Sequence, residues 1–131
     1  MPAVNWLAVI AAAISMFVIG GVWYSALFQK QWMAANNFSD DDMKRGSPAV
    51  IFGVAFILSL LMAANLAFLV ATVPDLGAVV GYSVAAGLGF AAFGLSVVAL
   101  FERRPLMYHL INGGYLTVAF AVMGLILGLW R

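Results

Sequence analysis

Four long stretches of the chain are almost wholly apolar, and short polar segments separate them. Asp, Glu, Lys and Arg are absent from residues 1–29, 46–74, 76–101 and 105–130. About 20 apolar residues of helix cross the hydrocarbon core of a bilayer, so each stretch is long enough to do so. The pattern predicts an all-α membrane protein: an antiparallel bundle of four transmembrane helices in a single domain, 1–131. We expect these helices at about 4–27, 48–71, 76–101 and 106–130.

The polar residues between the spans indicate where the helices begin and end. Pro48 suits the first turn of a helix, where its missing N–H costs nothing. Pro74 ends one helix, and Asp75 is well placed to cap the next. The turns at 72–75 and 102–105 are so short that each helix must return antiparallel beside its predecessor. We therefore expect the last three spans to be consecutive neighbours, whereas the longer connection leaves the first span free to pack elsewhere.

The connection after the first span has room for structure of its own. Apolar Leu27, Phe28, Trp32 and Met33 among polar neighbours predict a short interfacial helix with its aromatic side in the lipid headgroups. Further on, Ser39 is a candidate N-cap for three consecutive aspartates at 40–42, which the helix dipole favours. A Ca²⁺ site is the alternative, but consecutive residues point around a helix and do not converge on one ion.

Composition supports the assignment to a membrane and narrows the chemistry. Of 131 residues, 66% are hydrophobic and only 8% are charged, which is too little charge to cover a soluble domain. The first stretch lacks the basic start of a signal peptide and is too long for its apolar region, so we expect a retained helix. The absence of Cys excludes disulfides and thiolate metal sites, and no basic patch suggests nucleic acid.

The distribution of Lys and Arg predicts the orientation of the chain. Five of the six lie in the first and third connections: Lys30, Lys44, Arg45, Arg103 and Arg104. The opposite side carries only Arg131. Lys and Arg favour the cytoplasmic side, so we expect both connections to be cytoplasmic and both termini to lie outside. The aspartates at 40–42 do not alter this, because acidic residues count little in the rule.

Small residues recur at helical spacing in the last two spans and indicate helix packing. Close backbone approach at such residues stabilises helix pairs in a bilayer. The third span has Gly77, Gly81, Ala85, Gly89, Ala92 and Ser96, and the fourth has Gly114, Thr117, Ala121, Gly124 and Gly128. Our interpretation is an intimate contact between these two spans within one chain. The alternative is that one of the two stripes faces a second protomer.

No carboxylate, Lys or Arg lies inside a predicted span. Ion-coupled transporters and pumps usually keep such a residue in the membrane, and small multidrug exporters with four helices depend on a Glu in the first helix. Helix 4–27 offers no carboxylate, only uncharged polar residues such as Asn5 and Ser15. His109 is the only histidine, and no carboxylate or Cys lies close enough in sequence to complete a metal site with it. We favour an interfacial or hydrogen-bonded histidine over a ligand or proton carrier, and we expect no cofactor.

The remaining polar residues of the spans could gather at the cytoplasmic end of the bundle. Polar groups at this depth need partners in the bundle or in a wet cavity. Hydrogen bonds between helices are the simpler interpretation. The alternative hypothesis is a small polar pocket that opens to the cytoplasm and that six residues at similar depth would form: Tyr24, Ser25, Tyr108, His109, Asn112 and Tyr115.

Two stretches resemble the signatures of a bacterial membrane family known as domain of unknown function 1761. The first is Gly21-Val22-Trp23-Tyr24-Ser25-Ala26-Leu27-Phe28-Gln29-Lys30-Gln31-Trp32, with Gln29 where the family pattern has Gly. The second is Phe101-Glu102-Arg103-Arg104-Pro105-Leu106, followed by Leu110-Ile111-Asn112-Gly113-Gly114-Tyr115 and Met123-Gly124. The resemblance implies a four-helix protein of the bacterial inner membrane, without assigned active-site residues. It draws attention to Lys30, Trp32, Arg103 and Arg104 at the cytoplasmic face.

These observations leave three functional hypotheses. The first is a structural or accessory membrane subunit without catalytic residues, which binds a partner or its own copies. The second is a homo-oligomeric carrier or channel for a small molecule or lipid, in which the polar residues face a lumen. The third is a membrane enzyme or haem protein, which lacks a nucleophile–base pair, a carboxylate dyad or a second histidine in this sequence. We favour the first, with the bilayer and a homo-oligomer or larger complex as partners.

Overall fold

The computed structural model describes residues 3–131 and is all-helical in that range. Four long apolar helices pack together, with a short helix in the first connection. The elements in chain order are α1 (Trp6–Val22), η1 (Trp23–Leu27), α2 (Gln29–Asn36), η2 (Asp42–Lys44), α3 (Pro48–Val70), α4 (Leu76–Ala86), η3 (Gly87–Ala92), α5 (Phe93–Phe101) and α6 (Leu106–Leu129). The π-helical turns η1 and η3 continue their neighbours, so the four spans are Trp6–Leu27, Pro48–Val70, Leu76–Phe101 and Leu106–Leu129. Each span begins and ends within two residues of the range expected from the sequence.

Short polar side chains set where these helices begin. The Asn5 Oδ1 accepts hydrogen bonds from the N–H groups of Leu7 and Ala8, at 3.1 and 3.3 Å. Ser47 caps α3, with Pro48 in its first turn, and Asp75 caps α4 by accepting from Ala78 N at 2.9 Å. The predicted roles of Pro48 and Asp75 are therefore confirmed. Each cap satisfies N–H groups that the first turn of a helix leaves without partners.

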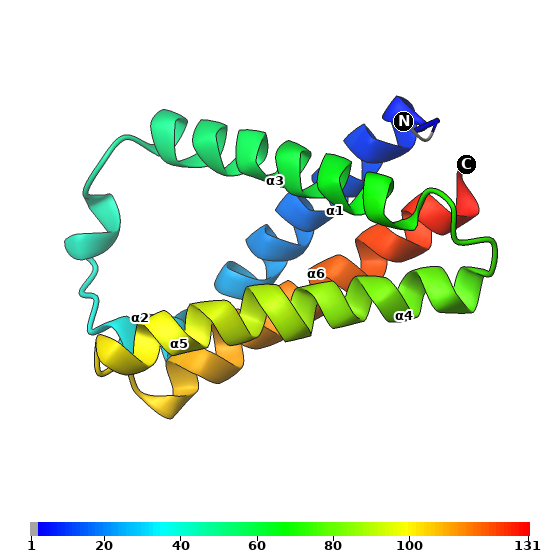
Figure 1. Cartoon of the computed structure of the whole chain (residues 1–131). Helices are drawn as coiled ribbons and strands as arrows, with labels where there is room; N and C mark the ends of the chain where they lie inside the picture. Colours follow the sequence, from blue (N-terminus) through cyan, green and yellow to red (C-terminus); the bar gives the residue numbers. More distant parts are fainter. Residues whose placement is uncertain (1–2) are drawn as a thin grey trace.

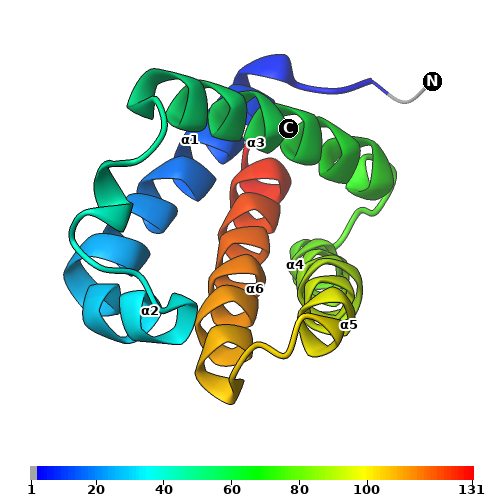
Figure 2. The same cartoon turned by 90° about the vertical axis from the view of Figure 1, so that its left-hand side faces the viewer.

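Helix α6 lies at the centre of the bundle. Figure 2 shows α1 on one side of it, the continuous α4–η3–α5 helix on the other, and α3 across α1. The expectation that 48–71 and 76–101 pack as neighbours along their length is wrong, because α3 packs chiefly on α1 and contacts α4 little. A short turn fixes only the helix ends that it joins, so the rest of α3 was free to take another partner.

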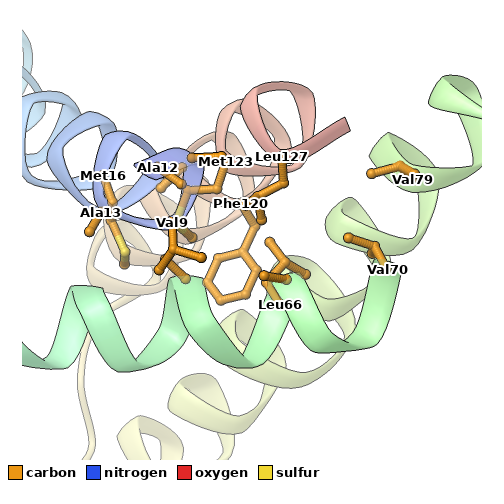
Figure 3. Close-up of a cluster of buried hydrophobic side chains, with 14 residues drawn as sticks. Val9, Ala12, Ala13, Met16, Leu66, Val70, Val79, Phe120, Met123 and Leu127 are labelled. Carbon is orange, nitrogen blue, oxygen red and sulfur yellow. The ribbon is translucent and has the colours of Figure 1, made fainter. Parts of the chain in front are cut away.

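The buried core lies where α1, α3 and α6 meet. Figure 3 shows Phe120 and Met123 of α6 among side chains from the other two helices, including Val9 and Leu66. Alanines at 8, 12, 13 and 63 are fully buried, which lets the backbones approach closely. All buried residues of α3 lie between Ser59 and Val70, and its first half is mostly exposed. On the outside of a bilayer protein such an apolar surface meets lipid.

The two ends of the bundle differ in what they carry. One end, here called the terminal end, holds both ends of the described chain and the turn between α3 and α4 (Figure 1). There the Asn5 Nδ2 donates to the Trp130 carbonyl at 3.2 Å, and Arg131 donates to the Ala71 carbonyl at 3.4 Å. The other end, the loop end, holds segments 28–47 and 102–105. This arrangement agrees with four antiparallel spans.

Candidate functional site

Polar and aromatic side chains connect α1 and η1 to α6 near the loop end. The Tyr24 hydroxyl donates to the Asn112 Oδ1 at 2.6 Å, and the Tyr115 hydroxyl donates to the Met16 carbonyl at 3.0 Å. The Trp23 Nε1 donates to the Ile111 carbonyl at 2.9 Å. Trp23 and Tyr24 lie in the π-helical turn η1, a type of turn frequent at functional sites. These three bonds give polar groups in the bundle the partners that a bilayer does not supply.

An aromatic cluster surrounds the Tyr24–Asn112 bond. The Tyr24 ring lies 5.3 Å from the Tyr115 ring and 5.4 Å from the Trp32 ring, measured between centroids. The Trp32 ring in turn contacts Phe38 at 5.5 Å, edge to face. These distances suit stabilising aromatic pairs. Helix α2, the short helix predicted for the first connection, therefore packs onto the loop end of the bundle through Trp32, whereas Lys30 remains exposed.

The structure brings only part of the hypothesised polar pocket together. Tyr24, Asn112 and Tyr115 form the cluster just described. Ser25 is exposed, and its hydroxyl donates to the Gly21 carbonyl of its own helix. Tyr108 is half-buried, with the Arg104 guanidinium carbon 5.3 Å from its ring centroid. His109 instead lines a groove with Phe93 and Ser96 of α5.

A groove of about 430 Å³ runs between η3–α5 and α6. Its lining is mostly apolar and includes Ala92, Phe93 and Leu110, with Ser96, His109 and Thr117 as its polar members. The Nε2 atom of His109 is enclosed and has no hydrogen-bond partner among residues 3–131. Among the six residues of the hypothesised pocket, only His109 lines this groove. The sequence did not indicate this groove, because two of its lining residues, Leu88 and Ala92, lie in the π-helical turn η3, which no periodicity of the sequence predicts.

The turn that joins α5 to α6, the two helices of the groove, carries two arginines. Arg103 is exposed and has a φ of +62°, a left-handed conformation that glycine usually supplies at the end of a helix. The N–H groups of Arg103 and Arg104 close the end of α5 by donating to the carbonyls of Leu100 and Ala99, at 3.1 and 3.0 Å. The Arg104 Nε is enclosed without a hydrogen-bond acceptor among the described residues, because the nearest Glu102 oxygen is 4.0 Å away.

The two stripes of small residues have different positions in the fold. Gly124 and Gly128 face α4, where a Cβ at Gly124 would overlap Ser83 and one at Gly128 would lie 2.6 Å from Leu76 Cδ1. Gly114 faces Trp23 instead, and a Cβ at Gly114 would lie 3.0 Å from the Trp23 Cζ2 atom. Gly77, Gly81 and Gly89 are exposed, and a Cβ at either of the last two would meet no atom within 4 Å. The contact of the two spans therefore uses the stripe on α6 but not these glycines of α4 and η3.

The described residues contain no group of three or more His, Asp or Glu placed to hold a metal ion. Three of the five carboxylates lie in the polar segment 40–42, and Asp75 and Glu102 lie in separate turns at opposite ends of the bundle. The chemistry that the site supports is hydrogen bonding, aromatic packing and attraction of anions by arginine.

Four long apolar spans define a multi-pass membrane protein that requires a lipid bilayer. The model of one family, described as Protein of unknown function (DUF1761), matches residues 7–128. The chain belongs to this family. No curated protein and no solved structure matches the chain.

Proposed function

We propose that the protein is a structural membrane subunit without catalytic activity, which associates with a second copy of itself through the outer face of α4. The observation that carries this proposal is the unused stripe of Gly77, Gly81, Ala85 and Gly89, which is exposed while the stripe on α6 is occupied within the chain. Small residues at every fourth position let two transmembrane helices approach closely. Such a face is also self-complementary about a two-fold axis, which favours a second copy as the partner.

The polar side chains support a structural role rather than a catalytic one. Tyr24, Asn112 and Tyr115 are the polar groups best placed to line a pocket, but they bond to each other or to backbone between α1 and α6. No carboxylate, Lys or Arg occurs within the spans. A carrier of the second hypothesis would need these polar groups on a surface that faces a lumen, whereas here they lie in an internal contact.

We further place the protein in the bacterial inner membrane, with the loop end in the cytoplasm and both termini outside. Lys30, Lys44, Arg45, Arg103 and Arg104 all belong to the two loop-end segments, and the terminal end has only Arg131. The rule that Lys and Arg favour the cytoplasmic side supports this orientation.

The association of two copies is tested by analytical ultracentrifugation or native mass spectrometry of the protein in detergent at several dilutions. Gly81→Leu is expected to raise the dimer dissociation constant about tenfold or more, because its side chain separates the two helices. Gly53→Leu is the matched control, since Gly53 is an equally open glycine on the exposed half of α3. A monomer at all dilutions, or equal effects of the two variants, would contradict the proposal.

A further inference from the structure

We propose that the groove between α5 and α6, together with Arg103 and Arg104, binds one anionic phospholipid. In this site the acyl chain lies in the groove and the phosphate contacts the two guanidinium groups. The inference does not depend on the proposed dimer, because none of the four residues of the dimer stripe, Gly77, Gly81, Ala85 and Gly89, lines the groove. Its first support is the groove itself, whose volume of about 430 Å³ lies within the range of ligand sites.

The lining of the groove fits a lipid chain. Leu88, Phe93, Leu110 and Val118 contribute apolar surface, and all four are exposed on the outside of the bundle. A groove in the outer surface of membrane-spanning helices is open to lipid rather than to water. Ser96 and His109 are the polar members nearest the loop end, about one turn of helix inside the last residue of α5 and the first of α6. They lie at the depth where the ester groups of a lipid join its chains.

The turn at the end of the groove fits an anionic headgroup. Arg103 is held in a left-handed conformation that glycine would adopt without strain. Such strain persists where the side chain has a use. The Arg104 guanidinium lies over the Tyr108 ring, its side chain is 37% exposed, and its ion pair with Glu102 is long, at 4.0 Å. Arginine binds phosphate through paired N–H donors, so two arginines in the turn that joins the helices of an apolar groove match a phospholipid.

The test is native mass spectrometry of the protein released from nanodiscs that contain equal amounts of phosphatidylglycerol and phosphatidylcholine. The wild-type protein is expected to retain one phosphatidylglycerol in preference to phosphatidylcholine. Replacing Arg103→Gln and Arg104→Gln together is expected to lower that preference about 10- to 30-fold, the loss of two arginine contacts near an anionic surface. The matched control is Lys44→Gln with Arg45→Gln, which removes the same charge from the other loop-end segment and is expected to leave the preference unchanged.

A second pair of variants tests the groove separately from the charge. Ser96→Leu fills the groove and is expected to lower retention of phosphatidylglycerol, whereas Val97→Leu on the neighbouring exposed position leaves it unchanged. Soluble glycerol phosphate is expected not to displace the lipid. The proposal would be overturned by an unchanged preference in the arginine variant, by unchanged retention in Ser96→Leu, or by an equal loss of preference in the Lys44 and Arg45 control. Displacement of the lipid by glycerol phosphate would also overturn it, because it would indicate a free phosphate as the ligand.

Discussion

At the scale of single residues, the internal contacts of this protein depend on a few polar groups that have no other partner. The Asn112 side chain is buried, and the Tyr24 hydroxyl at 2.6 Å is the donor to its Oδ1. In a bilayer neither group finds water as a substitute, so both gain from the bond between them. The residue motif Trp-Tyr-Ser in the first span thus has a structural explanation in its first two members.

Tyr24→Phe is expected to lower the free energy of unfolding by about 0.5–1.5 kcal/mol, because hydrogen bonds between membrane helices are worth that much. Tyr82→Phe is the matched control, since Tyr82 is 60% exposed on the outside of α4 and is expected to change little. Unfolding by sodium dodecyl sulfate in mixed micelles measures both variants. Equal stabilities of the two variants would show that the bond to Asn112 contributes nothing.

Asp42 shows how the polar segment 28–47 is ordered outside the membrane. Its carboxylate accepts hydrogen bonds from the Ser39 N–H at 2.8 Å and from the Ser39 hydroxyl at 3.0 Å, and the Asp42 N–H donates back to that hydroxyl at 3.2 Å. Ser39 therefore caps the turn that leads into η2, as predicted, in a reciprocal capping box. The bond from the Ser39 backbone, then that from its hydroxyl, and the nearby Arg45 hold the pKa of Asp42 below its usual range.

A lowered pKa in the folded state means that ionised Asp42 stabilises this turn. The contribution is complete above the ordinary carboxyl pKa of about 3.9 and is lost as the pH falls through the lower folded-state value. We expect the amide signal of Ser39 to shift in a pH titration followed by NMR, with its midpoint below that ordinary value. Ser39→Ala is expected to raise the Asp42 midpoint, and an unchanged midpoint in that variant would refute the assignment to the capping bonds.

At the scale of helices, α6 determines the arrangement of the bundle. Its Gly124 and Gly128 permit close contact with α4, and its Phe120 and Met123 fill the core shared with α1 and α3. Helix α3 has the fewest constraints, because its first half is exposed and the polar segment before it is long. The stability of the fold should therefore be most sensitive to changes on the inner faces of α6.

Gly124→Ala is expected to destabilise the protein by about 1–3 kcal/mol, the usual cost of overpacking. The added Cβ would overlap the Ser83 side chain, so the two helices must separate. Gly81→Ala adds the same methyl group where no atom lies within 4 Å, and alanine is the better helix former, so its unfolding free energy should stay equal or rise slightly. Thermal unfolding of the monomer in detergent compares the two variants. A destabilised Gly81→Ala monomer would show that Gly81 lies in a contact within the chain.

The sequence was sufficient for the spans but not for how they pack. The stretches without charged residues located the helices, because the thickness of the membrane sets the length of each span. Pro48 and Asp75 marked two helix starts, because capping depends only on neighbouring residues. The pairing of α3 with α1 and the outward position of Gly81 were not predictable, because Gly81 and Gly124 look alike in sequence and only tertiary contacts distinguish them. The similar depth of Tyr24 and Asn112 can be read from the sequence, but their bond to each other cannot. The groove at His109 includes Leu88 and Ala92 of a π-helical turn that has no sequence signal.

At the scale of the whole molecule, the proposed orientation gives the two ends different environments. The chain lacks Cys, so single cysteines report their side of the membrane without interference. Met43→Cys lies in the loop-end segment and Thr72→Cys lies in the turn of the terminal end, both exposed. In bacterial cells whose outer membrane is made permeable, a membrane-impermeant maleimide is expected to label only Thr72→Cys until the inner membrane is opened. The reverse pattern would invert the topology.

The exposed stripe on α4 makes self-association the central claim about the whole protein. Oxidative crosslinking of Ala85→Cys in native membranes tests it most directly, because Ala85 lies in the middle of that stripe. The expected result is a disulfide-linked dimer of Ala85→Cys, with little or none for Gly53→Cys on the exposed half of α3. If Ala85→Cys stays monomeric, or crosslinks no better than Gly53→Cys, α4 is not the contact between copies and the proposed function fails.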